Sequence, residues 1–130
     1  MAMHLPLTAL YAPLNGFLYL ALTFHTSRLR NRHRVFVGDG GVPELQRALR
    51  ASLNHGAYLP LALILMVVLE LSGVPRPMLH ALGGGMLLAR AVYALGALRE
   101  LQPAIQVGAA ATYLVLAAEG ACALVFAGSV

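Results

Sequence analysis

Charged residues are scarce in this sequence, and lysine is absent. Only 11% of the 130 residues are charged, whereas 59% are hydrophobic and the mean hydropathy is +0.74. Soluble domains typically have about 25% charged residues, so this composition excludes an ordinary soluble enzyme domain and indicates a membrane protein. All nine basic residues are Arg. A codon bias would give the same pattern, so the absence of Lys identifies no function.

Cysteine and metal-ligand patterns are equally sparse. The single cysteine, Cys122, cannot form an intrachain disulfide, and we expect it to be packed in an apolar core. His25, His33, His55 and His80 are scattered without the spacing of metal ligands on one helix face. We therefore expect no metal site.

Long hydrophobic runs dominate what remains. A transmembrane helix needs about 20 apolar residues to cross roughly 30 Å of hydrocarbon. Four segments meet this length: residues 5–26, 45–71, 78–98 and 104–127. Short breaks rich in Gly and Pro separate them, which predicts antiparallel neighbours. The prediction is an all-α integral membrane protein with one domain over residues 1–130, folded as a four-transmembrane-helix antiparallel bundle.

Two features inside the spans predict local packing. Pro60 lies within the second span, where it should kink the helix or loosen its hydrogen bonding. Gly83, Gly84 and Gly85 lie in the third span and should allow another helix to approach closely. The polar breaks are expected at residues 28–43, 72–77 and 100–103.

The arginines indicate an orientation. Most of them lie in or beside the first and third breaks, and only Arg76 lies in the second. Because cytoplasmic loops carry an excess of basic residues, the first and third loops should be cytoplasmic and both termini should lie on the opposite side. The cluster "RLRNRHR" also fits a stop-transfer signal that meets anionic lipid headgroups. It is short and has little aromatic interleaving, so nucleic-acid binding is not expected.

A polar stripe is predicted at the cytoplasmic end of the second span. Arg47, Arg50, Asn54 and Tyr58 are spaced by three, four and four residues, so they share one helix face. Such a stripe could clamp a carboxylate with Arg while Asn54 binds an amide and Tyr58 donates a hydrogen bond. Alternatively, the two Arg side chains reach toward headgroups and Asn54 joins helices together.

The third span carries a second stripe. Arg90 and Tyr93 share a face near the same membrane side, and an intramembrane Arg usually faces the bundle interior or a cavity. Arg90 is therefore either a functional residue or one member of an ion pair. Glu70 and Glu119 should lie roughly 20 Å or more away toward the opposite face. These two carboxylates are expected to be interfacial caps or a structural pair.

Four segments occur in order along the chain: "TALYAPLNGFLYLAL", "RLRNRHRVFVGDGG", "RASLNHGAYLP" and "ARAVYALG". Together they resemble the MAPEG family, the membrane-associated proteins in eicosanoid and glutathione metabolism. "RASLNHGAYLP" is similar to the family signature Arg-Ala-x-x-Asn-x-x-Glu-Tyr-x-Pro. The resemblance covers nearly the whole chain and indicates the small bacterial branch of the family, in the inner membrane.

The resemblance implies a homotrimer that binds glutathione between subunits near the cytoplasmic side. Several family members conjugate the thiol of glutathione to lipophilic electrophiles or reduce lipid hydroperoxides. The positions that match ligand-binding positions of the family are Arg30, Arg50, Asn54, Tyr58, Arg90 and Tyr93. Arg47 joins them through the stripe described above.

The chain departs from the family pattern in three of its four spans. Ala57 replaces the signature Glu that would meet the ligand's ammonium group. In the third span Tyr93 takes a His position and Leu95 a Tyr position. The fourth span has Ile105 or Gln106 where family enzymes have a thiolate-stabilising Arg. Lowering the pKa of the glutathione thiol from ~8.5 by about two units requires about 2.7 kcal/mol of thiolate stabilisation. A neutral Ile105 or Gln106 does not supply it, so Tyr93 and Arg99 are the candidate catalytic residues.

Three functions remain open at the level of the sequence. The first is a glutathione-dependent membrane transferase or peroxidase, with glutathione as cosubstrate. The second is a trimeric membrane protein without catalysis that binds another small anion or a lipid. The third is a structural membrane protein whose polar stripes only hold helices together.

Overall fold

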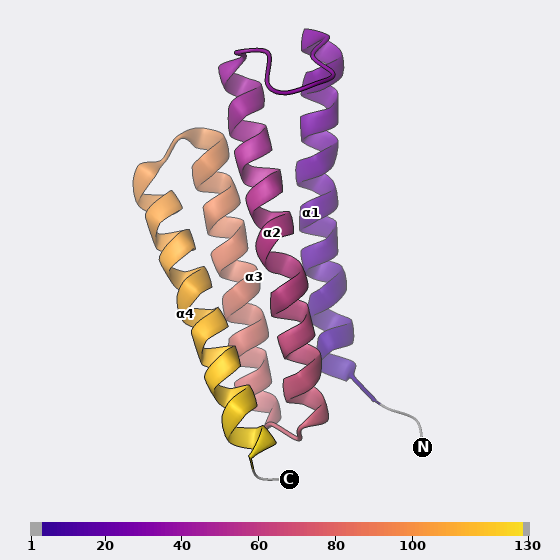
Figure 1. Ribbon diagram of the computed structural model, residues 1–130, viewed down its shortest axis with the longest axis vertical. Helices are drawn as coiled ribbons and strands as arrows, with labels where there is room; N and C mark the ends of the chain where they lie inside the picture. Colours follow the sequence, from indigo (N-terminus) through magenta and orange to yellow (C-terminus); the bar gives the residue numbers. More distant parts are fainter. Residues whose placement is uncertain (1–3, 129–130) are drawn as a thin grey trace.

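The computed structural model describes residues 4–128 and consists of four long α-helices joined by short loops (Figure 1). In chain order the helices are α1 (Pro6–His33), α2 (Pro43–Leu71), α3 (Arg76–Arg99) and α4 (Gln102–Ala127). Each is long and apolar enough to cross a membrane. The predicted all-α arrangement of four antiparallel transmembrane helices is confirmed.

The two middle helices form the centre of the bundle. α2 and α3 each contact all three other helices, whereas α1 and α4 make no contact with each other among the described residues. Figure 1 shows α1 and α4 at opposite edges. Side chains of α1 and α4 can therefore interact only through residues of α2 and α3, or across a cavity between the helices.

The first helix is longer than its apolar run predicts. Residues 28–33, expected in the first loop, continue α1, which ends where Arg34 adopts a left-handed conformation with φ 55°. Hydropathy marks only the part of a helix that lies in hydrocarbon, and the backbone hydrogen bonds continue into the headgroup region. The Arg34 N–H bonds to Arg30 O and closes the helix. The other breaks are also shorter than expected, because α3 starts at Arg76 and α4 at Gln102.

Glycines set the closest helix contacts. A Cβ on Gly83 would lie 2.5 Å from the Tyr11 ring, so the predicted close approach at the glycine triplet is confirmed, with α1 as the neighbour. On α4, a Cβ on Gly108 would lie 2.6 Å from the backbone N of Tyr93. The same holds for Gly96, 2.7 Å from the N of Ile105. α3 and α4 thus pack backbone against backbone.

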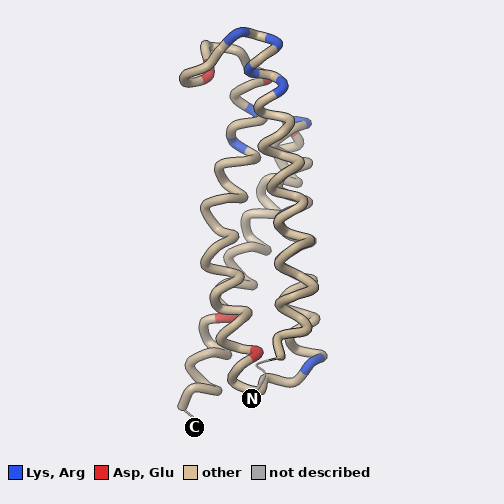
Figure 2. The backbone as a smooth tube through the Cα atoms, turned by 90° about the vertical axis from the view of Figure 1, so that its right-hand side faces the viewer, with Lys and Arg blue, Asp and Glu red and all other residues tan. Residues whose placement is uncertain are grey.

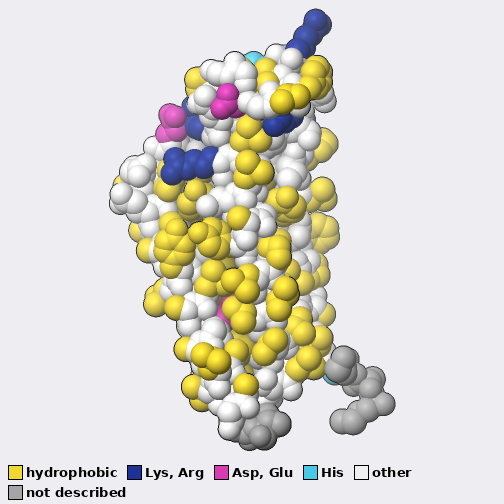
Figure 3. All heavy atoms as spheres, viewed as in Figure 1, with side chains coloured by type: hydrophobic (Ala, Val, Ile, Leu, Met, Phe, Trp, Pro, Cys, Tyr) yellow, Lys and Arg dark blue, Asp and Glu magenta, His cyan; other side chains and the backbone are white. Residues whose placement is uncertain are grey.

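Charge is distributed unevenly along the bundle. Figure 2 shows that the charged residues gather toward the end that holds the α1–α2 and α3–α4 loops, which we call the basic end. Below it, the face seen in Figure 3 carries hydrophobic side chains along its whole length, interspersed with backbone and small residues and with few charged groups. The opposite end, which we call the far end, holds the α2–α3 loop, where α1 begins and α4 ends. This pattern suits a bundle whose middle lies in lipid.

Candidate functional site

A buried arginine lies at the centre of the site. The Arg90 side chain is 1% exposed and donates to three side chains from two helices. Its Nε donates to His55 Nδ1 at 3.4 Å, one terminal nitrogen donates to Thr112 Oγ1 at 3.2 Å, and the other donates to Asn54 Oδ1. We call these four residues, with Tyr58 and Tyr93, the Arg90 cluster.

The partners of Arg90 are all uncharged. His55 is fully buried, and its Nε2 lies 3.1 Å from the backbone O of Asn15. A neutral imidazole that donates from Nε2 and accepts at Nδ1 satisfies both contacts. No carboxylate lies within ion-pair distance of Arg90 in the described part of the chain. The alternative of an ion-paired Arg90 is therefore wrong. Glu70 and Glu119, the two carboxylates of the membrane spans, lie nearer the far end.

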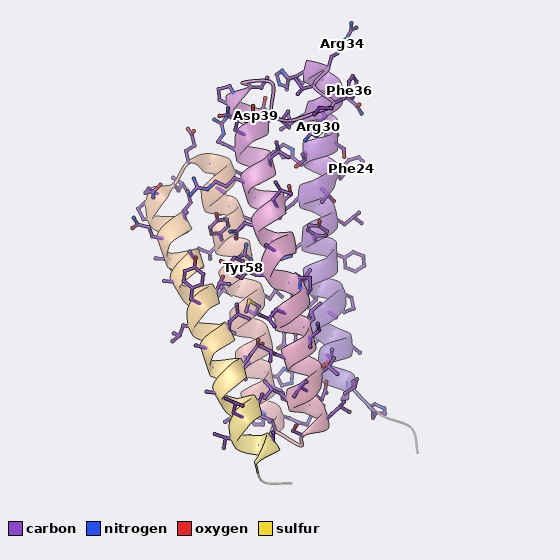
Figure 4. The ribbon with its side chains drawn as sticks, in the orientation of Figure 1. Phe24, Arg30, Arg34, Phe36, Asp39 and Tyr58 are labelled. Atoms are coloured by element: carbon purple, nitrogen blue, oxygen red, sulfur yellow. The ribbon has the colours of Figure 1, made fainter. Side chains whose placement is uncertain are left out.

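Aromatic faces complete the environment of the guanidinium. Its carbon lies 4.9 Å from the centroid of the Tyr93 ring and 5.4 Å from that of Tyr58, within the range of cation–π attraction. Tyr93 is 5% exposed, whereas the Tyr58 hydroxyl reaches Tyr113 OH at 3.4 Å on the outside of the bundle. Figure 4 shows Tyr58 about midway along the molecule. The predicted shared face of Arg90 and Tyr93 is confirmed.

The two arginines of the α2 stripe line a separate depression nearer the basic end. We call it the basic groove: a cavity of about 300 Å³ lined by Pro43, Gln46, Arg47, Arg50, Ala97, Glu100, Gln102 and Ile105. Arg47 pairs with Glu100 at 3.2 Å. Arg50 is exposed and forms no hydrogen bond or ion pair with residues 4–128. The groove thus contains one guanidinium without a partner.

The stripe on α2 connects the groove to the Arg90 cluster. Asn54 lies one helical turn beyond Arg50 and Tyr58 one turn further. Asn54 is half-buried, and its amide oxygen is occupied by Arg90. Its NH₂ group forms no side-chain hydrogen bond with residues 4–128. The predicted one-sided arrangement of the stripe is therefore present in three dimensions.

Two of the predicted arginines lie outside both features. Arg30 donates to the backbone O of Val35 at 3.2 Å and of Gly38 at 2.8 Å, and so organises the α1–α2 loop. Figure 4 shows it beside that loop at the basic end. Arg99 is exposed at the end of α3, adjacent in sequence to Glu100 of the groove. The carried-over role of Arg30 in ligand binding remains a prediction.

Several residues of the site were not predicted from the sequence. His55 and Thr112 bind Arg90, and Gln46, Glu100 and Gln102 line the groove. His55 offered one signal, since a polar residue within an apolar span needs a partner. Thr112 offered none, because it lies alone among small apolar residues on another helix. Within residues 4–128 no three His, Cys, Asp or Glu side chains gather as metal ligands.

Known proteins resemble this chain along most of its length. The model of the MAPEG family matches residues 8–125. The chain belongs to the MAPEG family. Within the family it is similar to inner membrane protein YecN of Escherichia coli strain K12, with 39% identity over 89 residues that cover 68% of each chain. The protein of the same name from Escherichia coli O6:H1 strain CFT073 matches to the same extent.

Proposed function

We propose that this MAPEG protein is a multi-pass protein of the bacterial inner membrane that binds glutathione at the basic groove. The name of its relatives supports the location, and membership of the MAPEG family supports the ligand class. The observation that carries the proposal is the exposed, unpartnered Arg50 guanidinium in a groove continuous with the polar stripe of α2. The basic end is then cytoplasmic, because arginines gather there.

Glutathione suits the groups along the groove. It has two carboxylates, and the planar guanidinium forks of Arg50 and Arg47 match carboxylates with two hydrogen bonds each. Arg47 would exchange its exposed pair with Glu100 for the ligand, and such surface pairs contribute little stability. One turn deeper, the Asn54 NH₂ group can donate to a peptide carbonyl. Arg90 acts as a positioning residue that fixes the Asn54 amide.

The site opens on the outer surface of the single chain, which supports assembly as a homotrimer. Arg50 is exposed, and Tyr113 is 57% exposed beside the half-buried Tyr58. A second copy packed over this face would cover polar groups that otherwise meet lipid. A glutathione molecule would then lie between two subunits.

We propose transferase or peroxidase chemistry toward lipophilic substrates as the activity. The thiol then needs a cation or donor near its sulfur, and Ile105 lines the groove where family enzymes have Arg. Arg99, at the end of α3, is the candidate cation. Tyr93 is buried, so its contribution would pass through the Arg90 cluster.

A second function has a specific observation in its favour. Ile105 stands where a thiolate-stabilising Arg is expected, and Ala57 removes the carboxylate that would meet the ammonium group of glutathione. Both changes weaken glutathione chemistry, whereas Arg47 and Arg50 of the groove remain for an anion. The alternative is a trimer without catalysis whose groove binds another small anion or a lipid headgroup. Both the glutathione-dependent enzyme and the non-catalytic trimer need Arg50 to bind an anion. The identity of the bound ligand distinguishes the two functions.

Calorimetric titration tests the proposal on the purified, detergent-solubilised protein. Glutathione should bind saturably, and Arg50→Ala should weaken binding about tenfold or more, because a charge-assisted hydrogen bond contributes about 1.5 to 3 kcal/mol. Arg28→Ala is the matched control: Arg28 is an exposed arginine of the basic end that does not line the groove. It should leave the affinity unchanged.

The remaining outcomes separate the alternatives. Binding of inorganic phosphate or of anionic lipid in place of glutathione, with the same loss in Arg50→Ala, would establish the second function. Equal loss in Arg50→Ala and Arg28→Ala would show only general attraction by the basic end. Binding unaffected by either change would contradict the groove as the site.

A further inference from the structure

Two buried polar atoms on different helices have no hydrogen-bond partner. They are Asn15 Oδ1 on α1 and Glu119 Oε2 on α4, and both side chains are 1% exposed. Among residues 4–128 these two side-chain atoms are the complete set of such orphans. Both residues line the same small cavity, which lies between all four helices. This coincidence indicates a shared partner.

The cavity offers acceptors and little else. Its other lining residues are Tyr11, Ala62, Leu63, Met66, Gly83 and Met86. Asn15 is oriented by its NH₂ group, which donates to the backbone O of Tyr11 at 2.9 Å, so its oxygen is the atom left unpaired. The Tyr11 hydroxyl is engaged with His80 Nδ1 at 2.9 Å. α2 and α3 contribute no titratable or charged group to the lining.

The cavity lies deep in the apolar part of the bundle. Asn15 is nine residues into α1 and Glu119 eight residues before the end of α4, which places both about 12 to 14 Å inside the far end. A carboxylate with neither a counter-ion nor a hydrogen-bond donor is strongly unfavourable at such depth, and Glu119 has neither among residues 4–128. A carboxylic acid that keeps its proton is uncharged, and it supplies the donor that the cavity lacks.

The space suits one water molecule. The cavity leaves about 10 Å³ for the centre of a water molecule, close to the roughly 10 to 15 Å³ that one water requires. Hard metal cations take about six or more oxygen ligands, more than Asn15, Glu119 and one water provide. The occupant that fits is therefore water together with a proton on Glu119.

We propose that Glu119, Asn15 and one internal water form a proton-binding site in the core of the bundle. The Glu119 acid donates its proton to the water oxygen, and the water donates to Asn15 Oδ1. Both orphaned atoms are then satisfied, and no net charge lies in the membrane interior.

The site has one route to the outside and one neighbour inside. Tyr11 lines the cavity and bonds to His80, which is exposed near the far end. Protons enter and leave by this route, opposite to the basic groove. On the inner side, the backbone O of Asn15 contacts His55, which in turn bonds to Arg90. The proton site thus adjoins the Arg90 cluster through α1.

Infrared spectra of the full-length protein at pH 7 test the proposal, with the spectrum of each variant subtracted from that of the parent. The parent should have a band of a protonated carboxyl group that Glu119→Gln removes, while the matched control Glu100→Gln leaves it in place. Asp39, Glu44 and Glu100 lie outside the apolar core, and Glu70 accepts three hydrogen bonds, so none of them should contribute. A difference spectrum that shows loss of an ionised carboxylate instead would overturn the proposal.

Two further variants test the water and the route. Asn15→Leu should shift the Glu119 band, because the water loses its acceptor, and this readout stands even where Glu119→Gln impairs folding. Tyr11→Phe should slow exchange of the Glu119 proton in D₂O severalfold, whereas Tyr113→Phe should not, because the Tyr113 side chain is 57% exposed and its hydroxyl lies on the outside of the bundle. An unshifted band in Asn15→Leu would contradict the shared water, and unchanged exchange in Tyr11→Phe would contradict the route.

Discussion

Arg90 keeps its charge among uncharged groups. Three neutral acceptors and two aromatic faces surround its guanidinium, and this arrangement spreads the charge without a carboxylate. Helical spacing predicted that Arg90 and Tyr93 share a face. It could not predict His55 or Thr112 as partners, because those contacts depend on how α2 and α4 are rotated about their own axes.

The two membrane carboxylates have different environments. Glu70 accepts hydrogen bonds from the backbone N–H groups of Leu7 and Thr8, both at 2.8 Å, and from the Thr8 hydroxyl at 2.6 Å. It thus caps the first turn of α1 from the end of α2, as expected for an anion at a helix N-terminus. The expected interfacial cap is confirmed for Glu70. For Glu119 it is wrong, because Glu119 lies in the core.

The cap gives a prediction for stability. Glu70→Gln should lower the free energy of unfolding by about 1 to 3 kcal/mol, because an amide has one acceptor oxygen and its NH₂ group opposes the N–H donors. Thermal unfolding in detergent measures the change. Glu100→Gln removes only an exposed pair with Arg47 and should stay within about 0.5 kcal/mol of the parent. Equal melting temperatures for both variants would refute the capping role.

At the scale of helices, glycine determines how α3 and α4 meet. Gly96 and Gly108 bring the two backbones together beside Tyr93 and Ile105. The glycine triplet of α3 is conspicuous in the sequence, because its three glycines are adjacent. Gly108 is not, since a lone glycine in an apolar helix resembles any other small residue.

This contact gives a second stability prediction. Gly108→Ala should destabilise the protein by about 1 to 3 kcal/mol, because the new Cβ meets the Tyr93 backbone, which cannot move aside. It should also disturb Tyr93 and Thr112, and so weaken ligand binding. Gly120→Ala on the same helix has no atom within 4 Å of the new Cβ and should be neutral or slightly stabilising. Thermal unfolding of the two variants side by side measures the difference, and equal stability would contradict the close contact.

At the scale of the whole molecule, much of the fold was readable from hydropathy. Span length identified the four helices, and short loops identified their antiparallel order. The helix ends were less predictable, because α1 continues through Arg28 and Arg32 beyond the apolar run. The packing order was not readable at all, since the separation of α1 from α4 depends on side-chain fit.

The orientation in the membrane is open to direct measurement. In a Cys122→Ala background, Val37→Cys places a thiol in the α1–α2 loop, where Val37 is 90% exposed, and Arg76→Cys places one at the far end. A membrane-impermeant maleimide added to intact spheroplasts should label the Arg76 position and spare the Val37 position. After lysis both should react, and the reverse pattern before lysis would place the basic end outside.

The position of Thr112 bears on how the chain enters the membrane during synthesis. Helices emerge from the ribosome in sequence order, so α3 arrives with its Arg90 before α4 exists. Of its three hydrogen-bond partners, Asn54 and His55, both on α2, are then already present. Thr112 supplies the last hydrogen bond when α4 follows. Hydrogen bonds to α2 therefore stabilise the charge of Arg90 until α4 is inserted.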